Sequence, residues 1–117
     1  QGFLCNIPVE KFEKTFVAAL PQQISGEAFI SKYKLSTDSV TQIIPEKTYA
    51  IRQCALHPVY EQARVTKFKQ HLLALHESAH QREEILSNMG ELMYQSHESY
   101  SLCGLGSDGT DEIVNLA

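Results

Sequence analysis

The 117-residue chain carries 10 basic and 14 acidic side chains, a net charge of −4 and 43% hydrophobic residues. This length is enough for one modest hydrophobic core and too short for two domains. Because no Lys/Arg run could neutralise a phosphate backbone, the composition argues against nucleic-acid binding. No apolar run approaches the roughly 18 residues that span a bilayer, and the N-terminus lacks a secretory signal pattern.

The three cysteines, Cys5, Cys54 and Cys103, are odd in number and far apart in the sequence. Their spacing encodes neither a disulfide framework nor a Cys-x-x-Cys metal knuckle. A reducing cytoplasm is therefore the expected location.

The first third of the chain predicts two short helices. Pro8 stands at a plausible first helical position and Pro21 ends the apolar periodicity of residues 9–20, so an amphipathic helix is expected there. A second helix is expected over residues 25–33, because Ser25 can accept hydrogen bonds from first-turn amides. From residue 34 to 55 the apolar residues no longer recur with a helical period. The β-branched residues at 40–44 favour a connector with one short strand.

Two long antiparallel helices follow and form the strongest structural prediction. His57-Pro58 predicts the start of the first, which runs to about His76, and residues 78–82 form the turn. Glu83 and Glu84 favour the start of the second helix, which continues to Tyr100. The predicted apolar faces are Tyr60, Arg64, Phe68, His71, Leu72 and Leu75 on one helix, and Ile85, Met89, Leu92, Met93 and Ser96 on the other.

A glycine inside the second helix and a glycine-rich loop after it are the next features. Gly90 is expected to let a neighbouring backbone approach. Residues 104–110 could present backbone amides to an anion, or could form a turn with Ser107, Asp108 or Thr110 capping a closing helix. The closing apolar run, residues 113–117, still has helical character where the sequence stops, so a longer protein is expected.

The histidines give little evidence of catalysis or metal binding. His76 and His80 have zinc-compatible spacing, but no third ligand follows, so solvated turn histidines are expected. His71 is expected as a core histidine and Cys103 as a small buried hydrophobe. His97 adjoins Ser96 and Ser99 before the glycine loop, where it could line a pocket or remain a surface residue. No catalytic triad, paired carboxylates or metal site can be assembled from these residues.

Several segments resemble sugar kinases of the GHMP superfamily, in the branch of galactokinases and plant-type arabinokinases. The resemblance is carried by Leu4-Cys5-Asn6, Tyr49-Ala50-Ile51-Arg52, Leu56-His57-Pro58-Val59-Tyr60-Glu61-Gln62-Ala63-Arg64-Val65, Gly90-Glu91-Leu92-Met93-Tyr94-Gln95-Ser96-His97-Glu98-Ser99-Tyr100-Ser101 and Cys103-Gly104-Leu105-Gly106-Ser107-Asp108-Gly109-Thr110-Asp111. It implies that residues 1–117 are a mainly α fragment, a helical hairpin plus short helices, of an α+β C-terminal kinase domain. The fragment would stop before the last glycine-rich motif.

The same resemblance implies the chemistry of the intact protein. Such kinases transfer the γ-phosphate of ATP, with Mg²⁺, to the anomeric hydroxyl of a monosaccharide of the galactose or arabinose type. The phosphate loop and catalytic aspartate would lie upstream, so no catalytic residue is expected in this fragment, which alone should be inactive and bind no cofactor. Its expected partners are the missing N-terminal half of the kinase and, through uncovered apolar surface, further copies of itself.

The resemblance places residues 96–111 on the sugar side of the cleft. The substrate-pocket candidates are Ser96, His97, Gly104, Gly106, Ser107 and Asp108. For Asp108, a hydrogen bond to the sugar and a helix cap are alternative roles. For the whole chain, the alternative is a non-enzymatic helical interaction module whose glycine loop is only a turn.

Overall fold

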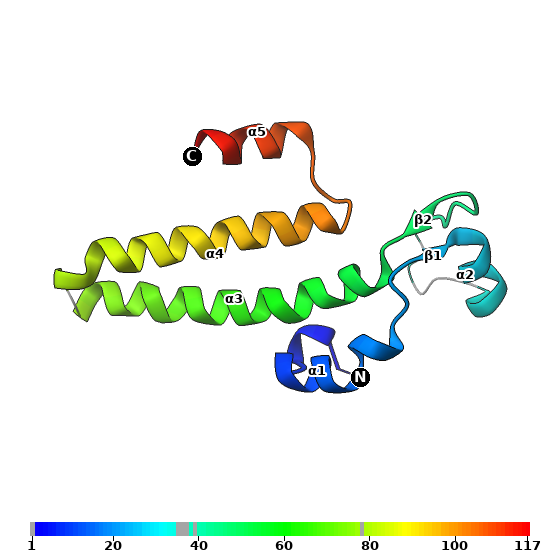
Figure 1. The fold of residues 1–117 in the computed structure, drawn as a ribbon, viewed down its shortest axis with the longest axis horizontal. Helices are drawn as coiled ribbons and strands as arrows, with labels where there is room; N and C mark the ends of the chain where they lie inside the picture. Colours follow the sequence, from blue (N-terminus) through cyan, green and yellow to red (C-terminus); the bar gives the residue numbers. More distant parts are fainter. Residues whose placement is uncertain (1, 35–37, 39, 78) are drawn as a thin grey trace.

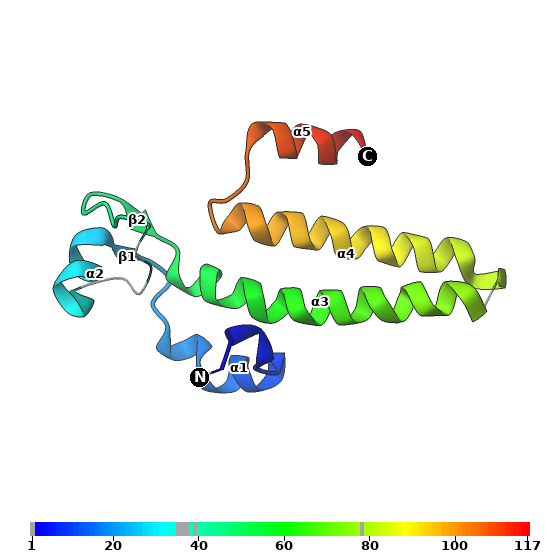
Figure 2. The ribbon, with the colours of Figure 1, turned by 180° about the vertical axis from the view of Figure 1, so that it is seen from behind.

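The computed structural model describes residues 2–34, 38, 40–77 and 79–117. Its central feature is a hairpin of two antiparallel helices, α3 (Ile51–Glu77) and α4 (Arg82–Leu102), which lie side by side in both ribbon views (Figures 1 and 2). The radius of gyration is 17.7 Å, against about 13 Å for a compact domain of this length. The chain is therefore elongated, and the mainly helical class predicted from the sequence is confirmed.

The first hairpin helix begins earlier than predicted. Helix α3 starts at Ile51, so Pro58 lies inside the helix and does not mark its start. A proline in this position removes the amide that would bond the carbonyl of Cys54. Contacts elsewhere support the extra turns: Arg52 Nε donates to the carbonyl of Leu20 at 2.9 Å, and the Cys54 amide donates to the carbonyl of Ala50. These contacts hold the start of α3 despite the proline.

The second hairpin helix follows its prediction closely, but its apolar stripe is only partly covered. Ile85 and Met89 are buried, whereas Met93 of α4 and Leu72 of α3 are 64% and 48% exposed. The interface between the helices is narrow, so the outer edges of the predicted faces remain open to solvent. The prediction for Gly90 is wrong, because no atom lies within 4 Å of the position that its Cβ would occupy.

The N-terminal arm packs against α3. The predicted first helix divides into α1 (Val9–Thr15) and a 3-10 turn, η2 (Val17–Ala19), and is preceded by another turn, η1 (Leu4–Asn6). Phe12 of α1 is 1% exposed, as is Val59 of α3. The Tyr60 hydroxyl donates to the Glu13 carboxylate and so connects α3 to α1. The arm thus covers the face of α3 that points away from α4 (Figure 1).

A small lobe precedes the hairpin. Strand β1 (Ile24–Ser25) pairs antiparallel with β2 (Thr48–Tyr49), with Ile24 opposite Tyr49 and Ser25 opposite Thr48. Strand β2 is thus the short strand predicted within residues 34–55, although it follows the β-branched run at 40–44. Helix α2 (Gly26–Tyr33) is capped by Ser25, whose hydroxyl accepts from the Ala28 amide at 3.1 Å, as predicted. A Cβ on Gly26 would lie 2.0 Å from the carbonyl oxygen of Ile44, so the lobe requires glycine there.

The two ends of α4 complete the fold. A 3-10 turn, η3 (Ala79–Gln81), precedes α4 at the hairpin tip, and Ser78 of the predicted turn lies outside the described residues. After the glycine loop the chain reverses into α5 (Asp108–Leu116), which runs above α4 (Figures 1 and 2). Helix α5 begins five residues before the predicted apolar run, because its N-cap lies at Ser107.

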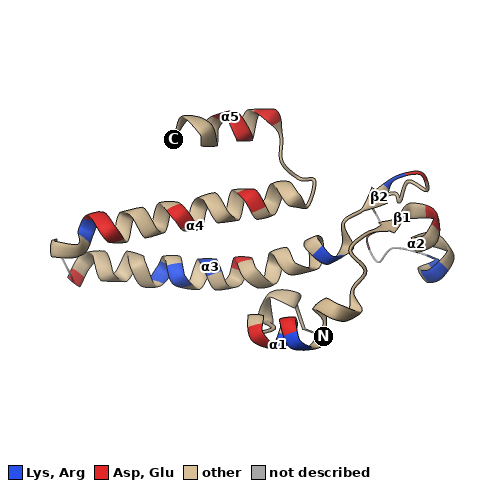
Figure 3. Ribbon diagram, viewed as in Figure 1, with Lys and Arg blue, Asp and Glu red and all other residues tan. Residues whose placement is uncertain are grey.

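Charge is mixed over the molecule. Acidic residues predominate on α4 and α5, while lysines and arginines are interspersed with acidic residues on α1 and α3 (Figure 3). The described surface therefore carries no continuous basic stripe for a phosphate backbone. None of the described helices combines the length and apolar character needed to cross a membrane.

Candidate functional site

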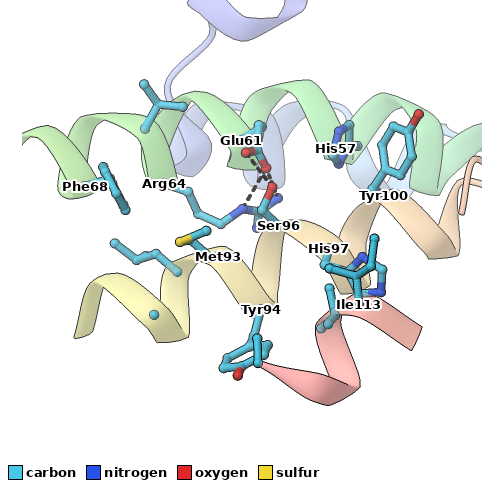
Figure 4. A pocket seen from close by; sticks show the side chains of 15 residues that line it. His57, Glu61, Arg64, Phe68, Met93, Tyr94, Ser96, His97, Tyr100 and Ile113 are labelled. Carbon is cyan, nitrogen blue, oxygen red and sulfur yellow. Dashed lines mark hydrogen bonds and ion pairs between the residues drawn. The ribbon is translucent and has the colours of Figure 1, made fainter. Parts of the chain in front are cut away.

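A groove of about 670 Å³ lies between α3, α4 and α5 (Figure 4). Its walls are mostly apolar. The hydrophobic lining includes Val65, Phe68, Leu92, Met93, Tyr100 and Ile113. Gly90 also lines it, so the missing side chain at this position widens the groove.

A polar cluster from both hairpin helices lies within this apolar groove. The Ser96 hydroxyl on α4 donates to Glu61 Oε1 on α3 at 2.7 Å. Arg64 Nε donates to Glu61 Oε2 at 2.9 Å, and an Arg64 guanidinium nitrogen lies 2.8 Å from the same oxygen. Figure 4 shows the three side chains converging between the helices. Both Glu61 oxygens are thus occupied, which makes the cluster an interhelical connection rather than a free acid or base.

The charge state of Glu61 follows from these contacts. Partial burial alone would raise the pKa of Glu61, but the hydrogen bonds from Ser96 and Arg64 oppose it. The positive charge of Arg64, and that of His57 when protonated, act in the same direction as the hydrogen bonds. The pKa of Glu61 therefore lies below its usual value, and the carboxylate is ionised at neutral pH.

Two histidines connect neighbouring helices at the groove. His57 Nδ1 on α3 lies 2.9 Å from the Ser99 hydroxyl on α4. His97 Nε2 on α4 lies 2.9 Å from Asp111 Oδ1 on α5, and these side chains are 22% and 51% exposed. His97 is thus a groove-lining residue that also contacts the closing helix.

The six predicted pocket residues do not gather at one cavity. Ser96 and His97 line the groove, as Figure 4 shows. Gly104, Gly106, Ser107 and Asp108 lie in the loop after α4 and at the start of α5, outside the residues that line it. The structure therefore gives two neighbouring regions: the groove, and an exposed glycine loop.

The glycine loop has a defined backbone. Gly104 has φ of +75°, a conformation that side-chain-bearing residues rarely adopt, and its amide donates to the Ser101 carbonyl. A Cβ on Gly106 would lie 2.7 Å from Ser101 Oγ and 3.3 Å from Ser101 Cα. Both glycines thus allow the chain to turn closely over the end of α4.

The cap of α5 is Ser107. Its hydroxyl accepts from the Thr110 amide at 3.3 Å, while the Thr110 hydroxyl accepts from the Ser107 amide at 3.0 Å. The prediction of a helix cap in the loop is confirmed for Ser107. Asp108 as the cap is wrong, because Asp108 is already the first helical residue.

The acidic and basic residues of α3 at the centre of the groove are not among the six predicted pocket residues. His57, Glu61 and Arg64 are spaced by four and three, so they share one face of α3. The predicted apolar face includes Arg64, and His57 and Glu61 are its titratable neighbours at this spacing. Titratable residues recurring along such a face are a signal of an interhelical polar cluster.

The remaining histidine and metal predictions concern other parts of the chain. His71 is half-buried on α3, and His76 and His80 are exposed near the hairpin tip. Among the described residues, no three His, Cys, Asp or Glu side chains gather where they could hold a metal ion.

Comparison with known proteins identifies a relative. Over 114 aligned residues the chain is 42% identical to L-arabinokinase of Arabidopsis thaliana. The alignment covers 97% of this chain and 10% of that protein. The chain is an arabinokinase-like segment. It spans about a tenth of the length of its relative. The aligned region includes the hairpin and the glycine loop. No protein-family model matches the chain, and no solved structure matches it.

Proposed function

We propose that this arabinokinase-like segment is a helical part of the C-terminal domain of a GHMP-type sugar kinase. The intact protein would use ATP and Mg²⁺ to phosphorylate the anomeric hydroxyl of a monosaccharide of the galactose or arabinose type, in the cytoplasm. The observation that carries the proposal is the 42% identity to L-arabinokinase, extended over 97% of the chain. ATP and the N-terminal part of the kinase are the partners that this function requires.

Within that kinase, the hairpin acts as a scaffold and the glycine loop as a wall beside the acceptor sugar. The close approach of Gly106 to Ser101 and the Ser107–Thr110 capping box support a fixed loop conformation. Asp108 is exposed, and no hydrogen bond to its carboxylate is found in the described part of the chain. Since Ser107 provides the cap, the Asp108 carboxylate remains available for a sugar hydroxyl.

The decisive test is Asp108→Ala in the intact kinase. If the carboxylate accepts a hydrogen bond from the sugar, the sugar KM should rise roughly ten- to a hundredfold, equivalent to about 1.4 to 3 kcal/mol. The KM for ATP should stay nearly constant. Steady-state kinetics with each substrate varied in turn would measure both values.

Thr110→Ala is the matched control. It removes the hydroxyl that accepts from the Ser107 amide and so weakens the same helix end, at a cost of about 1 kcal/mol, without touching Asp108. It should lower the melting temperature and leave the sugar KM unchanged. An unchanged sugar KM in Asp108→Ala would show that Asp108 does not bind the sugar. A rise in the sugar KM of equal size in Thr110→Ala would show the same.

A helical interaction module is the competing function, favoured by the uncovered apolar side chains. Met93, Ile113 and Leu116 are 64%, 69% and 82% exposed. Such a surface predicts self-association of the segment, measurable by sedimentation at high concentration. The reading frame around the sequence separates the two functions: a glycine- and serine-rich phosphate loop upstream supports the kinase, and start and stop codons at the boundaries support the module.

A further inference from the structure

Two cysteines that lie far apart in the sequence meet at the open end of the hairpin. Cys54 is in the first turn of α3 and Cys103 directly follows α4, 49 residues later. Cys54 Sγ lies 4.0 Å from the carbonyl oxygen of Cys103. In return, Cys103 Sγ lies 3.7 Å from the carbonyl oxygen of Gln53, the residue before Cys54. These reciprocal contacts bring the two thiols together.

The two thiols differ in accessibility. Cys54 is exposed, whereas Cys103 is half-buried. Burial, together with the neighbouring Cys54 sulfur, raises the pKa of the Cys103 thiol to about 11. A small oxidant in solution therefore reaches Cys54 first, and Cys103 is the thiol placed to react with the product.

We propose that Cys54 and Cys103 are a modification site at which a hydroperoxide forms a reversible disulfide. The Cys54 thiolate attacks the peroxide, the O–O bond breaks, and an alcohol or water leaves with the proton, giving Cys54 sulfenic acid. Cys103 sulfur then attacks Cys54 Sγ, the S–O bond breaks, and the departing hydroxide takes the Cys103 proton as water. The two thiols lose two electrons and the peroxide gains them.

This inference stands on the geometry of the thiols and does not depend on the proposed kinase function. Sequence spacing alone predicted no disulfide, because it could not show that the two ends of the hairpin meet. In a reducing compartment the bond would be transient, since cellular thiols exchange with accessible disulfides. When formed, it would connect the start of α3 to the residue preceding Gly104, and so restrict the entry to the glycine loop.

The test treats the purified 117-residue chain with one equivalent of hydrogen peroxide, blocks free thiols with an alkylating agent and digests with trypsin. Cleavage after lysine and arginine separates the cysteines into peptides 1–11, 53–64 and 83–117. The expected product is a cross-link between peptides 53–64 and 83–117, two hydrogens lighter than their sum, on a monomeric chain. Peptide 1–11 should remain alkylated at Cys5.

Cys5 supplies a matched control, because it is a half-buried free cysteine with no thiol partner in the described part of the chain. Cys5→Ser should leave the cross-link unchanged, whereas Cys54→Ser and Cys103→Ser should each abolish it, because each removes the only cysteine of one of the two linked peptides. Links that involve Cys5 as often as Cys54, links between chains, or sulfinic acid without any cross-link would each overturn the proposal.

Thermal unfolding gives an independent measurement. A bond between Cys54 and Cys103 closes a loop that contains nearly the whole hairpin, so oxidation should raise the melting temperature by roughly 10 °C. Dithiothreitol should reverse the shift, and Cys5→Ser should retain it. An oxidised chain that melts at or below the temperature of the reduced one would show that the thiols do not meet in the folded hairpin.

Discussion

The α3–α4 interface and the contact between α4 and α5 join neighbouring helices in different ways. Across the hairpin, buried Ile85 and Met89 are combined with polar contacts between Ser96 and Glu61 and between His57 and Ser99. Helix α5, in contrast, contacts α4 through the partly exposed His97–Asp111 pair and leaves much of its apolar face open. The hairpin is therefore expected to hold its geometry alone, while α5 depends on weak contacts.

This difference explains the groove. Because α5 stands off α4, side chains that would otherwise pack between the two helices line a cavity. Ile113 on α5 and Met93 on α4 both line it, yet both remain more than half exposed. A strongly amphipathic helix that buries little of its apolar face has the composition of an interface element. The hairpin provides the rigid part of the segment, and α5 the adaptable part.

The largest expected effect separates the two regions directly. Ile85→Ala removes a side chain that is 6% exposed in the hairpin interface and should lower the free energy of unfolding by about 2 to 5 kcal/mol. Ile113→Ala makes the same chemical change on α5, where the side chain is 69% exposed, and should change it by less than about 0.5 kcal/mol. Urea denaturation followed by circular dichroism would measure both, and equal losses would refute the contrast between the regions.

The polar cluster of the hairpin gives the next effect. Glu61→Gln keeps the shape of the side chain but leaves Arg64, whose side chain is 13% exposed, without its opposite charge. We expect a loss of about 1 to 3 kcal/mol at pH 7. Glu98→Gln is the control, because Glu98 is exposed on α4 and lies outside its first turn; this change should affect stability little.

The stability of Glu61→Gln relative to the unmodified chain should also depend on pH. Because the pKa of Glu61 is lower in the folded chain, its contribution is fully present above the ordinary glutamate pKa and is lost as the pH falls through the folded value. The stability difference between the unmodified chain and Glu61→Gln should therefore shrink from about pH 5 toward pH 3. A difference that stays constant over this range would mean that the carboxylate charge is not what stabilises the cluster.

The sequence predicts the features that depend on neighbouring residues. Periodicity predicts the hairpin, and the run of Ser107, Asp108 and Thr110 predicts a helix cap among these three residues, because each feature involves residues within one or two turns. The start of α3 was misplaced because Arg52 is held by the Leu20 carbonyl, 32 residues away. A local signal such as Pro58 predicts a helix start, but it carries no information about a contact between residues so far apart in the sequence.

The candidate site shows the same limit. Ser96 and His97, two of the six predicted pocket residues, line the groove, since the end of α4 positions them locally. Glu61, which bonds Ser96 from 35 residues away, could not be paired with it before the register of the hairpin was known. The separation of the glycine loop from the groove likewise depends on where α5 returns along α4.

The smallest expected effect concerns the contact that holds α5. Asp111→Asn removes the charge that faces His97, and a partly exposed pair of this kind contributes about 0.2 to 1 kcal/mol. Global stability should hardly change, because the hairpin does not depend on α5. The amides of α5 should instead exchange with deuterium roughly two- to fivefold faster, while those of α4 keep their protection.

Two further variants show whether this effect comes from the pair or from the helix dipole. Asp108→Asn also removes an acidic charge from the first turn of α5, but Asp108 has no contact with His97 among the described residues. His97→Gln removes the other partner and leaves the first turn unchanged. If the pair positions α5, the α5 amides should exchange as fast in His97→Gln as in Asp111→Asn. In both variants they should exchange faster than in Asp108→Asn. Equal acceleration in the two aspartate variants, with none in His97→Gln, would assign the effect to the dipole, and α5 would then be positioned by its apolar contacts in the groove.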